Sequence, residues 1–348
     1  MAGCGTQGAG DTGNSEQKIT AEQSSQNEQE DKEMEDYYIF ELSDNVTRTA
    51  VTYKNRYGIT LSGDLYVSKD MDTSAKYPAL IVGPPYGGVK EQGPGVYANQ
   101  LAQRGFIVLA FAPSFNGESG GDARHVSSPD IFAEDFSAGV DYLGTLDYVD
   151  REKIGAIGIC GSGGFALSAA QIDARIKAVA TSAMYDIAGF GGMMDNEAWQ
   201  NSIKSLAEQR WADVDNGETQ YNPQYKEDEI LEEVPESYTG NMAEFFEFYG
   251  MKRGHHPRAT GGFTTTSSMA MNNFQSLNHI NKISPRPILF ITGDIAHSKA
   301  FSETAYENAV EPKELYVAPN NTRHIDLYDD INKIPFDKLE TFFKENLK

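Results

Sequence analysis

The chain has 348 residues, of which 39% are hydrophobic, so it is long enough to bury a large core. Its formal net charge of -22 excludes nucleic acid and anionic membrane surfaces as partners, because their phosphate groups would be repelled. The two cysteines, Cys4 and Cys160, are too few for a disulfide framework.

Residues 1–36 form a polar leader rich in Gly, Ser, Gln and Glu, with too little apolar surface to fold. We expect a disordered acidic tether there. Ala2-Gly3-Cys4 resembles the end of a bacterial lipobox whose hydrophobic signal has been replaced by a start methionine. This predicts a cell-envelope lipoprotein anchored through a lipid on Cys4. The alternative is an incidental cysteine in a cytoplasmic protein. No apolar run is long enough to span a bilayer, so that lipid is the only membrane link expected.

Alternating and continuous apolar patterns follow in chain order. Segments 46–53 and 59–67 alternate apolar with polar residues around a short turn, which predicts an antiparallel hairpin at a sheet edge. Short runs without alternation are typical of parallel strands covered on both faces. They lie at 77–82, 106–111, 154–159, 176–182, 288–292 and 315–317. Helical patterns lie between them, at 96–104, 130–148, 163–174, 302–310 and 336–347. This alternation predicts an α/β fold with a doubly wound, mostly parallel sheet.

The interval between the sixth and seventh core strands is about a hundred residues long, far more than a normal crossover needs. Helical patterns at 197–212 and 243–248 carry aromatic residues, including Trp199, Trp211 and Phe245. We therefore expect a helical cap. The predicted organisation is a tether over 1–36, a core over 37–186, a cap insertion over 187–283 and the rest of the core over 284–348.

The most informative stretch runs from Lys153 to Gly164, with the sequence KIGAIGICGSGG. It reads as a buried strand that turns sharply into a helix, the nucleophile elbow of hydrolases, in which small residues stand two before and two after the nucleophile. Two frames satisfy this rule, one centred on Cys160 and one on Ser162. The length of the preceding strand favours Cys160, and Ser162 remains the alternative.

Several segments together resemble the α/β-hydrolases, and more narrowly bacterial proteins related to dienelactone hydrolase, a group that includes polyketide-transferase-like fungal enzymes. The resemblance covers most of residues 45–348. Its segments are PPYGGVKEQ (84–92), FNGESGG (115–121), GICGSGG (158–164), RGHHP (253–257), SPRPILFITG (284–293) and HIDLY (324–328). Members of this kind place cysteine at the position of Cys160. The resemblance implies an α/β-hydrolase fold that acts on carboxylic ester-type bonds without a cofactor.

In this fold the catalytic histidine follows the last strand, which implies His324. An acid that orients the imidazole is expected at the carboxyl edge of the sheet, where Asp294 is the first choice and Asp186 the alternative. Asp326 follows the histidine too closely and is expected to be structural. Where the common hydrolase pattern has an acid three residues after Gly293, this chain has Ala296.

Two backbone N–H groups are expected to hold the oxyanion. Gly161 follows the nucleophile and supplies one. Pro84 and Pro85 have no N–H, so Tyr86 is the first plausible donor of the second loop. Lys90 and Glu91 are predicted to form an ion pair that fixes this loop. A thiolate is expected at Cys160, because the helix N-terminus, His324 and these donors all favour the anion.

Cofactors and metals are not expected. His255 and His256 in the cap are candidates for the pocket wall, but they lack further ligands at zinc spacing. The sequence thus predicts an acyl hydrolase for an ester, lactone or thioester with a Cys-His-acid mechanism and a small-molecule acyl substrate. The alternatives are a serine carboxylesterase with Ser162 as nucleophile, an acyltransferase, and a non-catalytic lipid-anchored binding protein on a hydrolase scaffold.

Overall fold

The computed structural model describes residues 37–222 and 225–348. The chain divides into two compact units, residues 1–38 and 39–348, and the helices and strands described below lie in the second unit. The tether predicted over residues 1–36, with the lipid expected on Cys4, falls outside the described residues and stays a prediction. Within the described ranges, no helix has the length and apolar character needed to cross a membrane.

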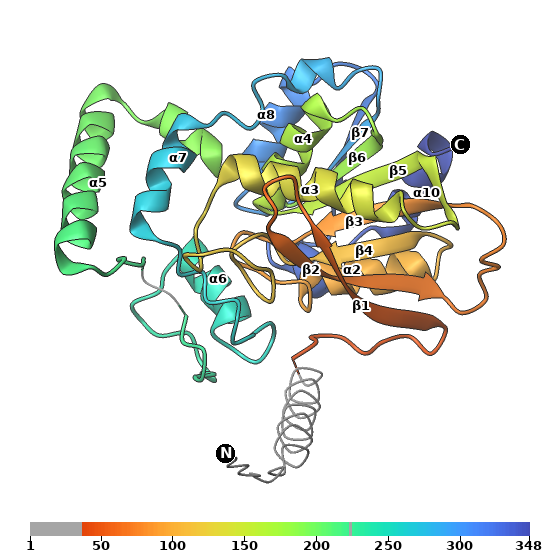
Figure 1. Ribbon diagram of the computed structural model, residues 1–348, viewed down its shortest axis with the longest axis horizontal. Coiled ribbons are helices and arrows are strands. Elements are labelled where there is room, and N and C mark those ends of the chain that lie inside the picture. The colour runs from red at the N-terminus through yellow and green to blue at the C-terminus, as the bar shows by residue number, and fades with distance from the viewer. Residues whose placement is uncertain (1–36, 223–224) are drawn as a thin grey trace, which may run out of the picture. The chain divides into compact units, whose positions relative to one another are not determined.

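One eight-stranded sheet forms the centre of the second unit (Figure 1). Its strand order is β1-β2-β4-β3-β5-β6-β7-β8, with antiparallel pairing at β1/β2 and β2/β4 and parallel pairing elsewhere. The mostly parallel sheet predicted from the sequence is confirmed. The strands are β1 (Val46–Lys54), β2 (Thr60–Ser68), β3 (Tyr77–Gly83), β4 (Ile107–Phe111), β5 (Val149–Ile159), β6 (Ile176–Ser182), β7 (Ile288–Gly293) and β8 (Lys313–Ala318).

The predicted hairpin is present at the edge of the sheet, where β1 and β2 pair from Val46–Ser68 to Lys54–Thr60. Asn55 shapes its turn, because its side-chain oxygen accepts hydrogen bonds from the backbone N–H groups of Tyr57 and Ile59. The amide of Asn55 also donates to the buried carboxyl of Asp135 at 3.0 Å. The hairpin is thereby tied to the helix that carries Asp135.

Helices cover both faces of the sheet, and two apolar clusters fill the layers between. One cluster joins the sheet to α2 (Gly93–Ala102) and α10 (Phe336–Asn346). The other joins it to α3 (Pro129–Leu143), α4 (Ser162–Ile172) and α8 (Lys299–Asn308). Successive residues of β3 alternate between the clusters, which explains why the central strands read as continuous apolar runs.

The chain between β6 and β7 forms the predicted cap. Its helices are α5 (Asn196–Asn216), α6 (Asn241–Tyr249) and α7 (Ser268–Asn273), with 3-10 turns at Ala188–Met193, Thr265–Ser267 and Ile280–Lys282. Figure 1 shows α5 at the outer side of the cap. Only Leu206 of α5 is buried, and Trp211, which was expected on an apolar face, is 70% exposed. That prediction for Trp211 is wrong, whereas α6 does bury Phe246, Phe248 and Tyr249.

The two largest differences from the predicted element boundaries are five residues each. Helix α3 ends at Leu143 rather than at residue 148, and β5 begins at Val149 rather than at residue 154. The cause is pairing at the start of β3, where Tyr77 lies opposite Val149 and its N–H donates to the carbonyl of Tyr148. The chain must therefore leave the helix early enough to reach the sheet. The short helix α9 (Asp326–Asp329) was not predicted.

Candidate active site

Cys160 occupies the sharp bend between β5 and α4. Its φ of 52° lies in the left-handed region, which non-glycine residues adopt rarely and at a cost of about 1–3 kcal/mol. A Cβ at Gly158 would overlap the backbone carbonyl of Ser162. The residues two before and two after Cys160 are thus in contact, which is the geometry that an elbow centred on position 160 requires.

Ser162 is the first residue of α4 rather than the bend itself. It lines a cavity of only about 10 Å³, and its Oγ would lie 2.9 Å from a Cβ at Gly83. Cys160 instead lines a cavity of about 430 Å³. The two alternative nucleophiles therefore face different spaces, and Cys160 faces the one with room for a substrate.

The oxyanion donors expected from the sequence converge on Cys160. The backbone N–H groups of Tyr86 and Gly161 both interact with its sulfur and favour the anionic form. The ring of Tyr86 is fixed by stacking on Phe263, with ring centroids 4.1 Å apart, and its hydroxyl donates to Ser127 at 2.7 Å. The loop after β3 is thus held rigidly over the elbow.

The cavity in front of Cys160 has a largely aromatic wall with contributions from the core and the cap. No charged side chain is among its lining residues in the described ranges. These residues are Tyr86, Cys160, Tyr185, Ile187, Phe190, Tyr225, Asn241, Met242, Phe245, Tyr249, Gly261 and Tyr328. Its volume falls in the range of small-molecule sites, and its wall suits an apolar ligand with few polar groups.

His324 is fully buried and reaches Cys160 through a hydroxyl group. Its Nε2 lies 2.8 Å from the hydroxyl of Tyr328, and that hydroxyl also interacts with the sulfur of Cys160. On the other side of the ring, Nδ1 lies 2.7 Å from Oγ of Ser298. The four side chains form one continuous chain in the order Cys160, Tyr328, His324 and Ser298.

Sequence reasoning missed Tyr328 and Ser298 as site residues. A signal for Tyr328 was present, since it stands four residues after His324 in the HIDLY segment and such residues lie on one face of a helical turn. Ser298 had no comparable signal, because its position depends on the path of the loop after β7.

Burial decides the protonation state of the site. It raises the pKa of Cys160, although the hydroxyl of Tyr328 and the N–H groups of Tyr86 and Gly161 pull the pKa down. Burial and the neighbouring His297 lower the pKa of His324 well below its usual value. The resting pair is therefore a thiol and a neutral imidazole, and the thiolate expected from the sequence is wrong for the resting site.

His297 adds a second imidazole beside the first. Its ring stacks on that of His324 with centroids 4.5 Å apart and an interplanar angle of 30°. Its Nδ1 lies 2.8 Å from the hydroxyl of Tyr185, and Nε2 lies 3.8 Å from a carboxylate oxygen of Glu244. Burial lowers the pKa of His297, which keeps the stacked pair neutral near pH 7.

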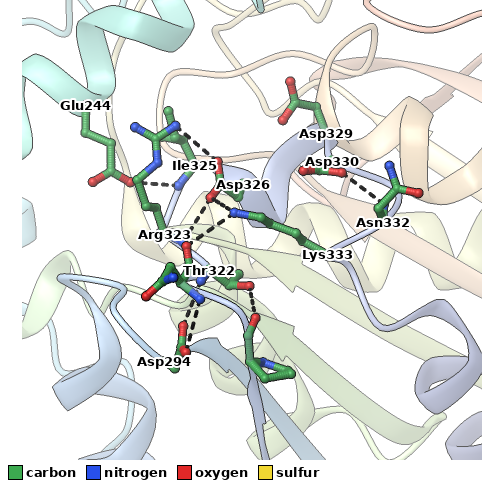
Figure 2. A network of polar contacts seen from close by, with 12 residues as sticks. Glu244, Asp294, Thr322, Arg323, Ile325, Asp326, Asp329, Asp330, Asn332 and Lys333 are labelled. Carbon is green, nitrogen blue, oxygen red and sulfur yellow. Dashed lines mark hydrogen bonds and ion pairs between the residues drawn. The ribbon is translucent and has the colours of Figure 1, made fainter.

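Asp294 and Asp186, the acids proposed for the triad, have other partners. The carboxylate of Asp294 accepts hydrogen bonds from the backbone N–H groups of Asn321 and Thr322, at 3.2 and 2.7 Å, and so supports the loop that carries His324 (Figure 2). Asp186 accepts from the N–H of Gly189 and lines a separate cavity of about 510 Å³. The position next to Nδ1 of His324 is held by Ser298.

Asp326 has the structural role expected of it. Its carboxylate contacts Lys333 at 2.7 Å and Arg323 at 3.2 Å (Figure 2). Arg253 lies 3.3 Å from the same carboxylate. Burial raises the pKa of Asp326, but Lys333, the guanidinium of Arg323 and a hydrogen bond from the N–H of Arg323 outweigh it and hold that pKa well below its usual range. Asp326 thereby fixes the turn between His324 and Tyr328.

The predicted pair of Lys90 and Glu91 is buried and belongs to a larger cluster. Nζ of Lys90 lies 2.6 Å from Glu91, 3.2 Å from Asp64 and 3.3 Å from Glu118. Beside this cluster, burial lowers the pKa of His256 to about 3.

Within the described part of the chain, no group of three or more His, Cys, Asp or Glu side chains is arranged to hold a metal ion.

Neither cap histidine is among the described residues that line the cavity of Cys160. The ring nitrogens of His255 lie 3.2 and 3.1 Å from the carbonyl oxygens of Tyr249 and Glu227. Nδ1 of His256 accepts the N–H of Arg258 at 3.0 Å. The ring of His255 therefore connects segments of the cap, and neither ring forms part of the described pocket wall.

Similar proteins agree with this architecture. The sequence pattern of the Dienelactone hydrolase family matches residues 64–186. The uncharacterized protein PA2218 of Pseudomonas aeruginosa is 46% identical over 316 residues, which cover 88% of this chain and 83% of that protein. Its crystal structure has a TM-score of 0.82 and covers 88% of this chain and 96% of that one.

More distant relatives share parts of the chain or the fold. Thiohydrolase aneE of Aspergillus aculeatus is 33% identical over 122 residues, which cover 35% of this chain and 37% of that protein. The crystal structure of the alpha/beta hydrolase GrgF from a Penicillium species has a TM-score of 0.71 at 21% identity, covering 86% of this chain and 99% of that one. With the elbow, the sheet order and the cap in place, the chain belongs to the dienelactone hydrolase family and has the α/β-hydrolase fold.

Proposed function

We propose that the protein is an acyl hydrolase that cleaves an uncharged ester, lactone or thioester through a covalent intermediate on Cys160. One observation carries this proposal: the sulfur stands at the elbow, opens into a cavity of about 430 Å³ and interacts with the two backbone N–H groups of Tyr86 and Gly161. An elbow nucleophile next to two aligned donors is the arrangement that acyl transfer needs.

The first half-reaction acylates the enzyme. The thiol gives its proton to the hydrogen-bonded chain that ends at His324, the sulfur forms a bond to the acyl carbon, and the carbonyl electron pair moves to oxygen. The N–H groups of Tyr86 and Gly161 stabilise that oxyanion by about 3 kcal/mol each. The bond to the leaving group then breaks, and the leaving group takes the proton back from His324.

The second half-reaction releases the acid. Neutral His324 accepts a proton from water, the water oxygen attacks the thioester carbon, and collapse of the intermediate returns the electron pair to the sulfur, which is reprotonated. An acceptor alcohol in place of water would make the same intermediate an acyltransferase intermediate. Hydrolysis is the default, because water needs no binding site of its own.

The wall of the cavity supports a substrate class. A carboxylate on the acyl group would be buried among aromatic rings, and no cationic side chain among the described lining residues could pair with it, at a cost of several kcal/mol. An aromatic or aliphatic acyl group instead gains contacts with Tyr185, Phe245 and Tyr249. The name of the relative thiohydrolase aneE supports thioesters among the substrates.

The test compares the full-length protein with Cys160→Ala and Ser162→Ala. Each is mixed with p-nitrophenyl butyrate and p-nitrophenyl benzoate, and we follow the nitrophenol burst and the intact mass of the quenched protein. We expect wild type and Ser162→Ala to give a burst and an acyl adduct, and Cys160→Ala to give neither. Thermal unfolding of all three proteins controls for loss of the fold.

Other results would favour the alternatives. A burst that persists in Cys160→Ala and disappears in Ser162→Ala would identify a serine carboxylesterase. Folded wild type that forms no adduct with oxygen esters or with an acyl thioester would identify a non-catalytic binding protein. Transfer of the acyl group to added alcohol in preference to water would identify an acyltransferase.

A further inference from the structure

We propose that the hydroxyl of Tyr328 is a catalytic proton relay between the sulfur of Cys160 and Nε2 of His324. This inference rests on the proposed function, since it concerns how the thiol of that mechanism loses its proton. The hydroxyl interacts with the sulfur of Cys160, which lines the same cavity, and lies 2.8 Å from Nε2 of His324. It therefore occupies the place where a direct contact of sulfur and imidazole would otherwise be.

The position of Tyr328 is fixed by its surroundings. Its side chain is fully buried in α9, four residues after His324. Phe248 packs against the ring edge to face, with centroids 5.0 Å apart and an interplanar angle of 89°, and the ring of His324 lies 5.2 Å away. The hydroxyl is thus directed along the line between base and nucleophile.

The hydrogen-bond directions allow a complete transfer. With the proton of His324 on Nδ1, that N–H donates to Oγ of Ser298, and Nε2 accepts from the hydroxyl of Tyr328. The hydroxyl oxygen can then accept from the thiol before transfer, and after transfer the hydroxyl donates to the thiolate, which lowers the pKa of Cys160. Each donor in the chain meets one acceptor, so the resting site is ready for transfer toward the imidazole.

The transfer balances without any added reactant. The S–H bond of Cys160 breaks while an O–H bond forms at Tyr328, and the original O–H bond of Tyr328 breaks while an N–H bond forms at Nε2. Tyr328 begins and ends as a neutral phenol, and the products are thiolate and imidazolium. Burial raises the pKa of Tyr328, which disfavours a free phenolate and therefore favours movement of both protons together.

Tyr328 also lines the substrate cavity. The reverse transfer can therefore pass the proton from the imidazolium through the same hydroxyl to the leaving group, whose bond to the acyl carbon breaks in front of Cys160. One residue then serves both proton steps of acylation.

The experiment compares full-length wild type with Tyr328→Phe, and uses Tyr66→Phe as the matched control. Tyr66 is also fully buried, but it lies in β2 and is not among the residues that line the cavity. We measure the burst rate constant with p-nitrophenyl butyrate from pH 5 to 10, and the intact mass after quenching. General acid-base groups contribute about 100- to 10,000-fold, so we expect Tyr328→Phe to acylate at least about 100-fold more slowly at pH 7.

The pH profile separates a relay from a packing role. In Tyr328→Phe the burst rate constant should rise steadily toward high pH, because hydroxide can form the thiolate without the relay, whereas in wild type it should be flat around neutrality. The adduct should still form on Cys160 in the variant. Tyr66→Phe should keep both the wild-type rate constant and the wild-type profile.

A measurement on wild type alone keeps the proposal testable if Tyr328→Phe does not fold. The burst rate constant in mixtures of H₂O and D₂O should curve downward as expected for two protons in flight. A linear dependence, or a Tyr328→Phe variant with the wild-type rate constant and profile, would overturn the relay and leave Cys160 as the nucleophile. Absence of any adduct on Cys160 in wild type would instead overturn the proposed function.

Discussion

Oγ of Ser298 lies 2.7 Å from Nδ1 of His324, where a hydrolase triad has a carboxylate. A hydroxyl orients the ring and fixes its tautomer, but it carries no charge to stabilise an imidazolium. Burial and His297 both lower the pKa of His324, and nothing at Nδ1 opposes them with a negative charge. In the proposed mechanism His324 is therefore a weak base, and its imidazolium gives up the proton readily.

Removal of the Ser298 hydroxyl should impair catalysis more than folding. We expect Ser298→Ala to lower the burst rate constant about fivefold, since one neutral hydrogen bond contributes about 1 kcal/mol. Ser302→Ala is the matched control, because it removes a buried hydroxyl four residues later, within α8. Equal rate constants for wild type and Ser298→Ala would show that His324 needs no partner at Nδ1.

The pH dependence of acylation follows from the two shifted groups. The rate constant should fall only as His324 becomes protonated, with a midpoint below about 6.5, because its pKa is lowered. It should show no decline up to about pH 9, because the pKa of Cys160 is raised and ionisation of the thiol yields a stronger nucleophile. Burst measurements after pH jumps from a neutral stock test this, and a bell-shaped profile centred near pH 6 would contradict it.

Replacement of His297 should change the pKa of His324, the base of the proposed mechanism. Coulombic repulsion from His297 lowers the pKa of His324, so His297→Phe should raise that pKa and move the acidic midpoint of the burst rate constant to higher pH. Phenylalanine preserves the stacking of rings around His324. His279→Phe, which makes the same change at an exposed histidine, should leave the midpoint in place. An unchanged midpoint in His297→Phe would mean that burial alone sets the pKa of His324.

The elbow should not tolerate a side chain at Gly158. Gly158→Ala would push a methyl group into the backbone carbonyl of Ser162, so the strand and the helix must separate and Cys160 must move. We expect loss of the burst and a lower melting temperature. A Cβ at Gly192 meets no atom within 4 Å, so Gly192→Ala should behave as wild type. A fully active Gly158→Ala variant would rule out the tight elbow.

The buried cluster around Lys90 should stabilise the fold as long as it is complete. Lys90→Met leaves Asp64 and Glu91 buried beside a neutral side chain, and loss of one partner from a buried ion pair costs about 3–5 kcal/mol. Urea unfolding should show that loss. Lys153→Met, which breaks a half-exposed pair with Asp150 at 3.5 Å, should cost less than about 1 kcal/mol. Equal stabilities of the two variants would contradict this account.

The residues of the candidate site that directly follow a strand could be located from the sequence. Cys160 and Tyr86 follow adjacent parallel strands, β5 and β3, so a correct strand order suffices to bring them together. The resemblance to the α/β-hydrolases placed His324 after the last strand. The sheet itself was predictable because its buried strands carry a strong apolar pattern.

The acid was not predictable, because it depends on the path of one loop. Asp294 and Ser298 both follow β7, and only the fold of the residues between them decides which one reaches His324. Asp294 turns instead to the backbone of Thr322. Likewise, the protonation state of Cys160 depends on how completely the cap buries it, and no local pattern encodes that.

The enclosed, protonated sulfur of Cys160 has a chemical consequence outside turnover. Hydrogen peroxide and iodoacetamide react with thiolates, so a cysteine whose pKa is raised by burial is a poor target for both. The protein should therefore keep the sulfur of Cys160 reduced through an oxidative challenge that inactivates enzymes with exposed, low-pKa cysteines.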